Sequence, residues 1–416
     1  MSTDSRIITA SVLPPPRSVT GIGGWIRVNL VNTWFNIGLT TVFGFILVVA
    51  LWYGLKWVFF DADWRVIGTL GGRIIIGQYN VEAACPGRDC FWRPQAGLLL
   101  VMVLLGMAWS VSGGGLTKRI AVLFAGALVA CAFLPYGLDK MGLDVRLLFA
   151  ANVPALALGW AIARHTRLGT VSWIAVLAFC TFILILVLLR GIPGVPYLKP
   201  VSVLYWGGLM LNLLLAVVGI GLSLPIGITL ALGRSSRLKV VNLLCVTFIE
   251  TFRGVPLITL LFMSQVLVPL AFPENFPQNS LVRAAIIITL FSSAYMAENI
   301  RGGLQSLHPG QGEAARALGL PVWQTTLFIS LPQAIRNVIP AIVGQFISLF
   351  KDTSLVYIIG MLDVVEMSRA FIQGNPEYLA SAKEVFVFLA AVFWVFTFTM
   401  SHVSRRVEQH LGVGKR

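Results

Sequence analysis

Residues 313–332 read EAARALGLPVWQTTLFISLP, one of very few polar stretches between long apolar runs in the second half of the chain. A helix is expected to begin just before it, at Ser306 or at His308-Pro309. The alanines that follow give this helix a shallow, close-packing surface. Gly319 can take the left-handed backbone conformation that stops a helix, so we expect the first helix to end there.

Pro321 then suits the first turn of a second short helix, which we expect to run to about Ile329 and to be closed by Leu331-Pro332. Glu313 lies early enough in the first helix to favour its positive end. The pattern predicts a helix-turn-helix on the cytoplasmic face, where small side chains let the cleft of another protein approach and Glu313 offers a charge for register. The alternative is an ordinary amphipathic hairpin at the membrane interface.

The composition places the rest of the chain in a membrane. Of its 416 residues, 57% are hydrophobic and 12% are charged, and a soluble core cannot hide that much apolar surface. Ten apolar runs are long enough to cross about 30 Å of hydrocarbon as helices, near 37–60, 96–112, 120–137, 146–163, 170–189, 203–232, 253–272, 284–300, 338–361 and 385–403. We therefore expect an all-α integral membrane protein with about ten transmembrane helices, since lipid cannot satisfy an open strand edge.

The net charge of +14 indicates topology rather than nucleic acid binding. If the N-terminus is cytoplasmic, the predicted inside segments carry 17 basic and three acidic residues, whereas the outside loops carry 11 of each sign. The whole basic excess then falls on one side of the membrane, as the positive-inside rule requires. Ten spans return the C-terminus to the cytoplasm, so we expect both termini inside.

The chain divides near residue 195, where Gly191-Ile-Pro-Gly-Val-Pro196 ends one hydrophobic run. We expect a cytoplasmic arm over 1–35, an N-terminal extension of about five transmembrane helices over 36–195, and a second domain over 196–416. No cleavable signal peptide is expected, because the first apolar run is too long for one. Polar residues intrude at membrane depth mainly in the second domain, so function is sought there.

Three of the five cysteines lie in apolar runs and are interpreted as small core residues: Cys131, Cys180 and Cys245. Cys85 and Cys90 differ, because they share the loop 61–95, which we predict to be periplasmic. An oxidising compartment permits a disulfide between them. Two free thiols are the alternative, because four intervening residues fix no geometry.

The 313–332 stretch resembles, letter for letter, the EAA loop by which the permease subunits of bacterial ABC importers engage their ATPases. The pattern is E-A-A, three residues, G, nine residues, I-x-L-P. Every fixed position is filled, by Glu313, Ala314, Ala315, Gly319, Ile329, Leu331 and Pro332. The resemblance implies that these residues couple the chain to an ATPase, in a loop that spans 307–332.

Segments that flank this loop look like the matching segments of polar amino acid permeases, the histidine and glutamine transport class. They are Phe252-Arg-Gly-Val-Pro-Leu257, Ala294-Tyr-Met-Ala-Glu298 with Arg301-Gly-Gly303, and Leu349-Phe-Lys-Asp-Thr-Ser-Leu355. Val255 departs from the threonine that many members carry. The match covers roughly residues 203–412, and the added N-terminal half is similar to the enlarged permeases of the general L-amino acid and glutamate/glutamine/aspartate/asparagine subgroup.

Lys351 and Asp352 lie near the middle of the run 338–361, where each charge costs about 2.5 to 3.5 kcal/mol unless it has a partner or a wet cavity. Adjacent helical residues point about 100° apart, so both can face one spot only if the helix loosens there. Thr353 and Ser354 can satisfy backbone groups that such loosening frees. A zwitterionic amino acid carries one charge of each sign, so this stretch is a candidate substrate pathway. A structural ion pair with neighbouring helices is the alternative.

The run 240–272 exceeds a single span. We interpret residues 240–252 as an interfacial helix and 254–272 as the crossing, with Gly254 and Pro256 breaking the helix between them. Glu250 and Arg253 then lie near the cytoplasmic surface, with Arg253 either a gate or an interfacial anchor.

Glu298 and Tyr295 are further candidates for the pathway. Glu298 is expected one turn inside the end of its helix, and Tyr295, three residues earlier, lies on the same face. Glu298 either lines the pathway or is a buried acid that is paired with neighbouring side chains for structural reasons.

Other chemistries find no support in the sequence. Four histidines are scattered without metal-ligand spacing, namely His165, His308, His402 and His410. The phosphate-binding pattern G-x-x-x-x-G-K-[ST] does not occur. We expect no metal, cofactor or catalytic residue in this chain, with ATP and magnesium bound by a partner ATPase.

The resemblance implies a type I ABC importer in the bacterial inner membrane, with the last five helices as the permease core and the EAA loop as its coupling helix. The implied partners are a dimer of ATPase subunits, a second homologous permease in a heterodimer, and a periplasmic binding protein that meets loops 273–283 and 363–384. The implied substrates are polar L-amino acids. An ion-coupled secondary amino acid transporter is the alternative, and dependence of uptake on ATP rather than on an ion gradient separates the two.

Overall fold

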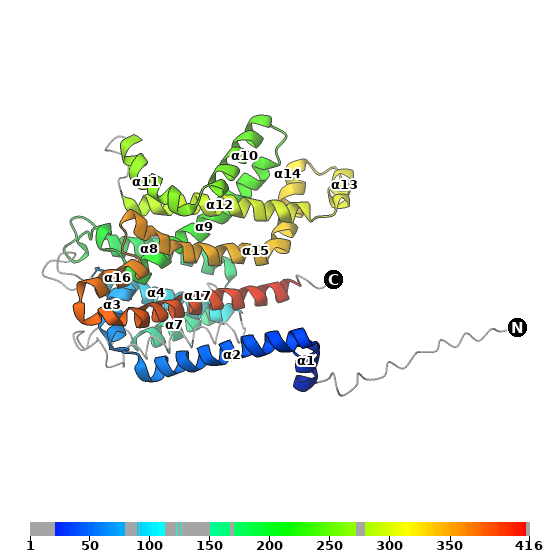
Figure 1. Ribbon diagram of the computed structural model, residues 1–416. Coiled ribbons are helices and arrows are strands. Elements are labelled where there is room, and N and C mark those ends of the chain that lie inside the picture. The colour runs from blue at the N-terminus through cyan, green and yellow to red at the C-terminus, as the bar shows by residue number, and fades with distance from the viewer. Residues whose placement is uncertain are drawn as a thin grey trace. The chain divides into compact units, whose positions relative to one another are not determined.

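The computed structural model describes residues 21–79, 90, 92–112, 122, 126, 150–166, 170–271 and 279–412. In these ranges the regular secondary structure is helical, apart from two isolated β-bridges. The chain forms two compact units, Met1–Asp63 and Trp64–Arg416 (Figure 1). The domain boundaries expected from the sequence, at 36 and 196, stay predictions.

The first unit consists of α1 (Gly21–Asn29), α2 (Trp34–Lys56) and the π-helical turn η2 (Trp57–Asp61). Thr33 begins α2, because its hydroxyl accepts the Asn36 N–H at 3.2 Å. The helical stretch Trp34–Asp61 is apolar on every side and long enough to cross a membrane. Such uniform hydrophobicity suits lipid rather than one face of a soluble core.

The N-terminal part of the second unit holds four described helices, α3 (Arg65–Ile76), α4 (Trp92–Ser112), α7 (Asn152–His165) and α8 (Val171–Arg190). Helix α4 packs against α7 and α8. Gly106 of α4 and Gly159 of α7 allow the close approach, because a Cβ atom on either would collide with the backbone of the other helix.

The remainder of the second unit, which we call the permease core after the resemblance noted in the sequence, is built around α12. Helix α12 packs against α9, α10, α11 and α15, and α17 packs against α15 and α16. After the short turns η3 (Pro196–Leu198) and η4 (Val203–Tyr205), its elements are α9 (Gly208–Arg234), α10 (Lys239–Gly254), α11 (Leu257–Ala271), α12 (Ser280–Gln305), α13 (Pro309–Ala317), α14 (Val322–Gln324), η5 (Thr325–Ser330), α15 (Leu331–Asp352), η6 (Thr353–Ile359), α16 (Val364–Gly374), η7 (Pro376–Ser381) and α17 (Ala382–Leu411).

Helix α3 lies in the segment that the sequence predicts to be a loop, so that prediction is wrong for residues 65–76. Three of its apolar side chains, Val66, Leu70 and Ile74, recur every four residues and are buried. They share one hydrophobic cluster with α16 and α17, made by Val66, Leu70, Ile74, Val364, Phe371, Ile372, Val385 and Leu389. A helix of 12 residues is too short to register as a span, and only its packing partners reveal its place.

The backbone joins the extension to the core at a glycine junction. Gly77 bridges to Trp206, and Gly208 bridges to Asp363. A Cβ atom on Gly77 would lie 2.5 Å from the Cα atom of Gly207, and φ at Gly77 is +64°. Only glycine fits this position without strain, so α3, the start of α9 and the start of α16 are held together at backbone distance.

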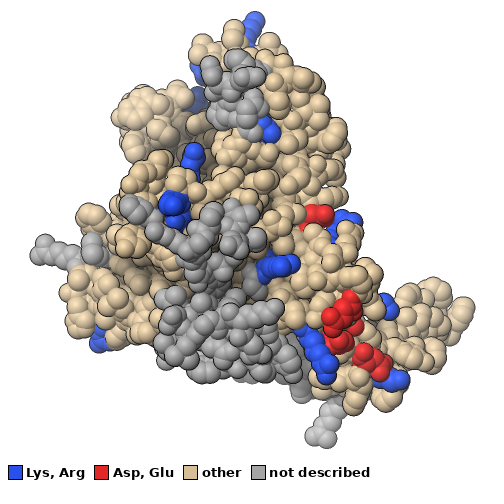
Figure 2. Space-filling view, turned by 90° about the vertical axis from the view of Figure 1, so that its left-hand side faces the viewer, with Lys and Arg blue, Asp and Glu red and all other residues tan. Residues whose placement is uncertain are grey.

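Among the described residues, seven helices are long and apolar enough to cross a membrane, or eight if the bent pair α10 and α11 is one span. The expected run 120–137 lies outside the described residues apart from Val122 and Gly126, and α7 covers only part of the run 146–163. Charged side chains occupy small areas among uncharged ones on the face in Figure 2. The all-helical membrane fold expected from the composition is therefore confirmed.

The two ends of the second unit carry different elements. Helices α13 and α14 lie at one end, together with the C-terminal end of α17 (Figure 1). Helices α3 and α16 lie at the opposite end (Figure 1). The segment that resembles the EAA loop is thus well separated from the glycine junction.

Candidate functional site

The segment that resembles the EAA loop, residues 307–332, is called the coupling segment after that resemblance, and its first helix is α13. His308 caps this helix, because its Nδ1 atom accepts the Gly310 N–H at 3.1 Å. Gly319 follows the helix with φ of +77°, and its N–H donates to the Arg316 carbonyl at 3.0 Å. The predicted helix stop at Gly319 is confirmed.

Two local expectations for this segment are wrong. Leu331-Pro332 does not close the second helix, because α14 runs through the π-helical η5 directly into α15, with Pro332 in its first turn. The proline lacks an N–H, and the first turn of a helix and the wider π turn before it tolerate that loss. Glu313 lies beyond the first turn of α13 and is exposed, so its carboxylate faces the surroundings instead of the helix start.

The coupling segment is anchored to α15 on one side and exposes apolar side chains on the other. Ala315 is only 2% exposed, and Gln333 Nε2 donates to Gln311 Oε1 at 2.7 Å, which ties α13 to α15. Five large apolar side chains of the segment are nevertheless exposed, namely Leu318, Val322, Trp323, Leu327 and Phe328. Apolar side chains gathered at one exposed segment are typical of a protein interface.

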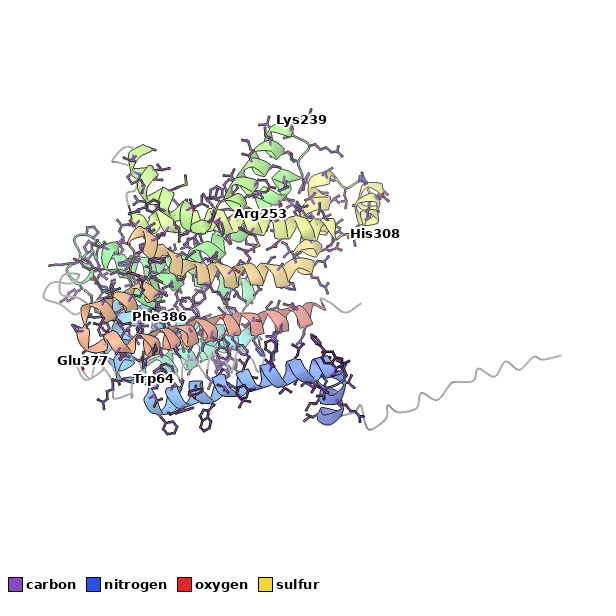
Figure 3. The ribbon with its side chains drawn as sticks, in the orientation of Figure 1. Trp64, Lys239, Arg253, His308, Glu377 and Phe386 are labelled. Carbon is purple, nitrogen blue, oxygen red and sulfur yellow. The ribbon has the colours of Figure 1, made fainter. Side chains whose placement is uncertain are left out.

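A second group, the Glu298 cluster, joins α9, α10 and α12. Glu298 is 14% exposed and bonds three guanidinium groups, with N–O distances of 2.8 Å to Arg234, 3.4 Å to Arg253 and 2.8 Å to Arg301. Arg234 also contacts Glu250 at 2.9 Å. Three arginines and two glutamates therefore link α9, α10 and α12 through ion pairs. Arg253 lies where α10 meets α12 (Figure 3).

The structure brings three of the predicted residues together in this cluster. The Arg253 guanidinium lies 5.5 Å from the centre of the Tyr295 ring and forms the ion pair with Glu298 described above. Helix α12 continues to Gln305, so Glu298 lies two turns inside its end rather than one. The backbone between α10 and α11 bends by 104° at the predicted break, which agrees with the roles expected of Gly254 and Pro256.

The helix changes type directly after Lys351 and Asp352, both of which still lie in α15. Helix α15 ends at Asp352, and the 3₁₀ helix η6 begins at Thr353. The Thr353 hydroxyl donates to the Phe350 carbonyl at 2.7 Å, and the Ser354 hydroxyl donates to the Lys351 carbonyl at 2.8 Å. Both hydroxyls satisfy carbonyl groups where the helix type changes, as expected from the sequence.

Lys351 and Ser354 line a pocket of about 300 Å³ together with residues of α16 and α17, namely Val365, Phe386, Leu389, Ala390 and Phe393. The pocket draws on other elements than the Glu298 cluster, and Figure 3 labels Phe386 on α17. Thr353 differs from its neighbours, because its side chain is fully buried. The predicted pathway residues thus fall into two separate groups, with Thr353 behind the second, whereas Asp352 lines neither the pocket nor the Glu298 cluster.

Sequence reasoning missed two buried polar residues: Asn212, which donates to Thr353, and Asp363, which contacts Asn212. Burial raises the pKa of the Asp363 carboxyl to about 6, although hydrogen bonds from the Glu366 and Val365 N–H groups and from Asn212 oppose that shift. A lone asparagine in the apolar run 203–232 and the spacing of Asp363 and Glu366, which is that of a helix cap, were the available signals.

The interpretation of Cys180 as a core residue is wrong, because its side chain is exposed, and Cys245 is only half-buried. Cys180 and Cys245 are free, whereas Cys90 is disulfide-bonded. Cys85 and Cys131 lie outside the described residues, so the pairing of Cys85 with Cys90 stays a prediction.

Comparison with known proteins gives this geometry its context. The family described as "Binding-protein-dependent transport system inner membrane component" matches residues 223–413. The glutamate/glutamine/aspartate/asparagine transport system permease protein BztC of Rhodobacter capsulatus is 32% identical over 449 aligned positions, which cover 99% of each chain. This chain is a permease of the binding-protein-dependent ABC transporter family.

Two further relatives cover the permease core. The inner membrane amino-acid ABC transporter permease protein YhdY of Escherichia coli is 48% identical over 219 residues, which are 52% of this permease and 59% of YhdY. A chain in the crystal structure of an amino acid ABC transporter with histidines is 29% identical over 49% of this permease and 92% of that chain, with a TM-score of 0.44. The permease is a multi-pass inner membrane protein of a family that works with ATPases and periplasmic binding proteins.

Proposed function

We propose that this permease moves polar L-amino acids, in the range of glutamate, glutamine, aspartate and asparagine, across the inner membrane in an ATP-driven importer. The observation that carries the proposal is the similarity to BztC, which extends over 99% of both chains and so includes the N-terminal extension. The pocket beside Lys351 supports it, because an ammonium group at membrane depth suits a substrate carboxylate.

The coupling segment receives the ATPase dimer in this proposal. Its exposed apolar side chains supply the contact surface, and Glu313 supplies a charge that sets register. ATP and magnesium bind to the ATPase subunits, whose closure rocks α13 and turns the cavity from inward-facing to outward-facing. Because Gln311 and Gln333 tie α13 to α15, the displacement reaches the helix that carries Lys351.

The other partners follow from the same layout. A related second permease completes a heterodimer, and the binding protein delivers the amino acid to 273–283 and 363–384, of which the latter comprises α16 and η7. Lys351, Asp352 and Ser354 form the substrate pathway, and Arg253, Tyr295 and Glu298 form its cytoplasmic gate. Both termini lie in the cytoplasm.

Uptake of radiolabelled amino acids by cells tests the proposal. We expect wild-type uptake of L-glutamate and L-glutamine to persist when the ion gradient is collapsed at constant ATP and to stop when ATP is exhausted. The opposite dependence would identify an ion-coupled transporter and refute the proposal.

Gly319→Asp tests the coupling role. An L-residue is strained at φ of +77°, so we expect Gly319→Asp to insert normally and to lose uptake. Gly319→Asn is expected to keep more activity, because asparagine is the residue that most often replaces glycine at such a helix stop, and Gly312→Asp adds a charge to α13 at a position with open space around it. Normal ATP-driven uptake by Gly319→Asp would contradict the proposed coupling role of this segment.

Gentle isolation of the tagged protein from its native membrane, followed by mass spectrometry, identifies the partners. We expect an ATPase subunit and a second permease with the wild-type protein and less ATPase with Gly319→Asp. A stable preparation that binds amino acids but carries neither subunit contradicts the assembly.

A further inference from the structure

Asn212 connects three elements of the permease core from a fully buried position on α9. Its side-chain Nδ2 donates to Thr353 Oγ1 at 3.1 Å and lies 3.5 Å from Asp363 Oδ2. Its Oδ1 accepts the Val364 N–H at 3.0 Å. Both ends of this amide are therefore occupied, one toward η6 and one toward the start of α16.

Thr353 is the first residue of η6 and directly follows Lys351-Asp352. Its hydroxyl donates to the Phe350 carbonyl while it accepts from Asn212. The same hydroxyl thus fixes the last turn of α15 and anchors it to α9. Removal of this hydroxyl would leave the carbonyl and the buried amide without that partner, which costs more than one ordinary hydrogen bond contributes.

Asp363, at the start of α16, is the third member of the buried polar group that Asn212 and Thr353 form. Its carboxylate accepts the Val365 N–H at 3.2 Å and the Glu366 N–H at 3.0 Å, which caps α16. Helix α16 supplies Val365 to the pocket that Lys351 and Ser354 line. One buried polar group therefore borders both walls of that pocket, the α15–η6 wall and the α16 wall.

We propose that Asn212, Thr353 and Asp363 are positioning residues, which hold Lys351 and Ser354 at the correct place against α16 while touching no substrate themselves. The inference rests on the proposed amino acid translocation. It assigns Thr353 to the support of the pathway instead of its lining, in line with its complete burial. Loss of the group displaces the pocket walls and weakens substrate binding, whereas coupling through α13 is untouched.

Kinetics of uptake in two Thr353 variants test this inference. Thr353→Val is nearly isosteric and removes the hydroxyl, so we expect the KM for L-glutamate to rise at least fivefold. Thr353→Ser keeps the hydroxyl and is expected to stay within twofold of the wild type. Thr353→Ala is the second variant, because it removes the hydroxyl without placing a methyl group against Asn212.

Thr289→Val provides the matched control. Thr289 is a buried threonine of α12, 4% exposed, whose hydroxyl has no hydrogen-bond partner in the described part of the chain. We expect this change to leave KM and maximal rate unaltered. Membrane levels and co-purified ATPase are measured for every variant, so a defect in assembly is separated from a change in KM.

Three results decide the matter. A raised KM in Thr353→Val or Thr353→Ala with rescue in Thr353→Ser supports the positioning role. Equal KM values in all variants, or equal loss in Thr353→Ser, overturn it. Failure of the wild-type protein to take up any amino acid refutes the proposed function instead, which keeps the two failures distinct.

Discussion

Asp363 gives the permease a built-in pH dependence of stability. Burial raises its pKa to about 6 from an ordinary value of 3.8, and Glu366, on the same helix, adds like-charge repulsion. An acid with a raised pKa binds its proton more tightly in the folded state, so folding is favoured below pH 4 and this contribution is lost as the pH rises to about 6. At 1.36 kcal/mol per pKa unit, the loss at pH 7 is on the order of 3 kcal/mol.

Thermal unfolding of the solubilised permease between pH 4 and pH 7.5 checks this prediction. Asp363→Asn keeps an N-cap acceptor and cannot titrate, so we expect its stability relative to the wild type to increase from pH 4 to pH 6 and then to level off. Glu377→Gln, at an exposed position of η7, is the control and should show no such trend. A constant difference between Asp363→Asn and the wild type would contradict the prediction.

Glu298 and Glu250 belong to one cluster and differ in burial. The Glu298 side chain is 14% exposed and contacts three arginines, whereas the Glu250 side chain is 54% exposed and contacts one. Glu298→Gln leaves three guanidinium groups against a single carboxylate, and we expect a loss of about 2 kcal/mol after allowance for solvent around the arginines.

Glu250→Gln is the matched control, with an expected change of less than about 1 kcal/mol. Unfolding of the two variants in the same detergent, at low and at high salt, gives the comparison. Equal effects of the two substitutions would show that the three-arginine contact adds nothing.

Individual residue types predicted several local features of this permease, because backbone geometry acts within a few residues. Gly319 stops α13, and Gly254 with Pro256 separates α10 from α11, as the sequence indicated. The contact between Asn212 and Asp363 is different, since 151 positions separate them in the sequence. Only the packing of α9 against α16 brings the two together, so no local pattern reveals it.

At the scale of elements, the glycine junction joins α3 to the permease core. A Cβ atom on Gly77 would lie within 3 Å of the Gly207 backbone, and φ there is +64°. We therefore expect Gly77→Ala to cost about 2 kcal/mol or more through overpacking and backbone strain. Gly71→Ala, within α3 and with no atom near its Cβ, should be neutral or stabilising by up to about 1 kcal/mol.

Thermal unfolding of the two alanine variants in one detergent measures both effects. The comparison isolates the junction, because both changes add one methyl group to the same short segment. If Gly77→Ala were as stable as Gly71→Ala, the close approach of Gly77 to Gly207 would not matter for stability.

Long apolar helices were predictable as elements, whereas short ones were not. The runs that became α9, α12 and α17 exceed the membrane thickness, so their hydrophobicity alone identifies them. Helix α3 has only 12 residues, and its glycines and arginines interrupt the apolar pattern that would identify its buried face in the sequence. Its burial against α16 and α17 depends on residues about 300 positions later, which periodicity within α3 does not disclose.

At the scale of the whole molecule, the charge distribution and the structure of the second unit agree on one topology. The predicted inside segments carry 17 basic residues against three acidic ones. Among these segments, α13 and the C-terminal end of α17 lie at one end of the second unit, opposite α16 (Figure 1). If the helices cross a membrane between these ends, we expect the coupling segment inside and η7 outside.

Fusions to a reporter enzyme that is active only in the periplasm test this topology. We expect activity when the reporter follows Glu377 in η7 and none when it follows Gly312 in α13 or Gly412 after α17, because each insertion point lies in a segment of assigned side. Equal amounts of each fusion in the membrane serve as the control. Activity after Gly312 together with silence after Glu377 would invert the permease, place the basic excess outside, and leave the coupling segment out of reach of any cytoplasmic ATPase.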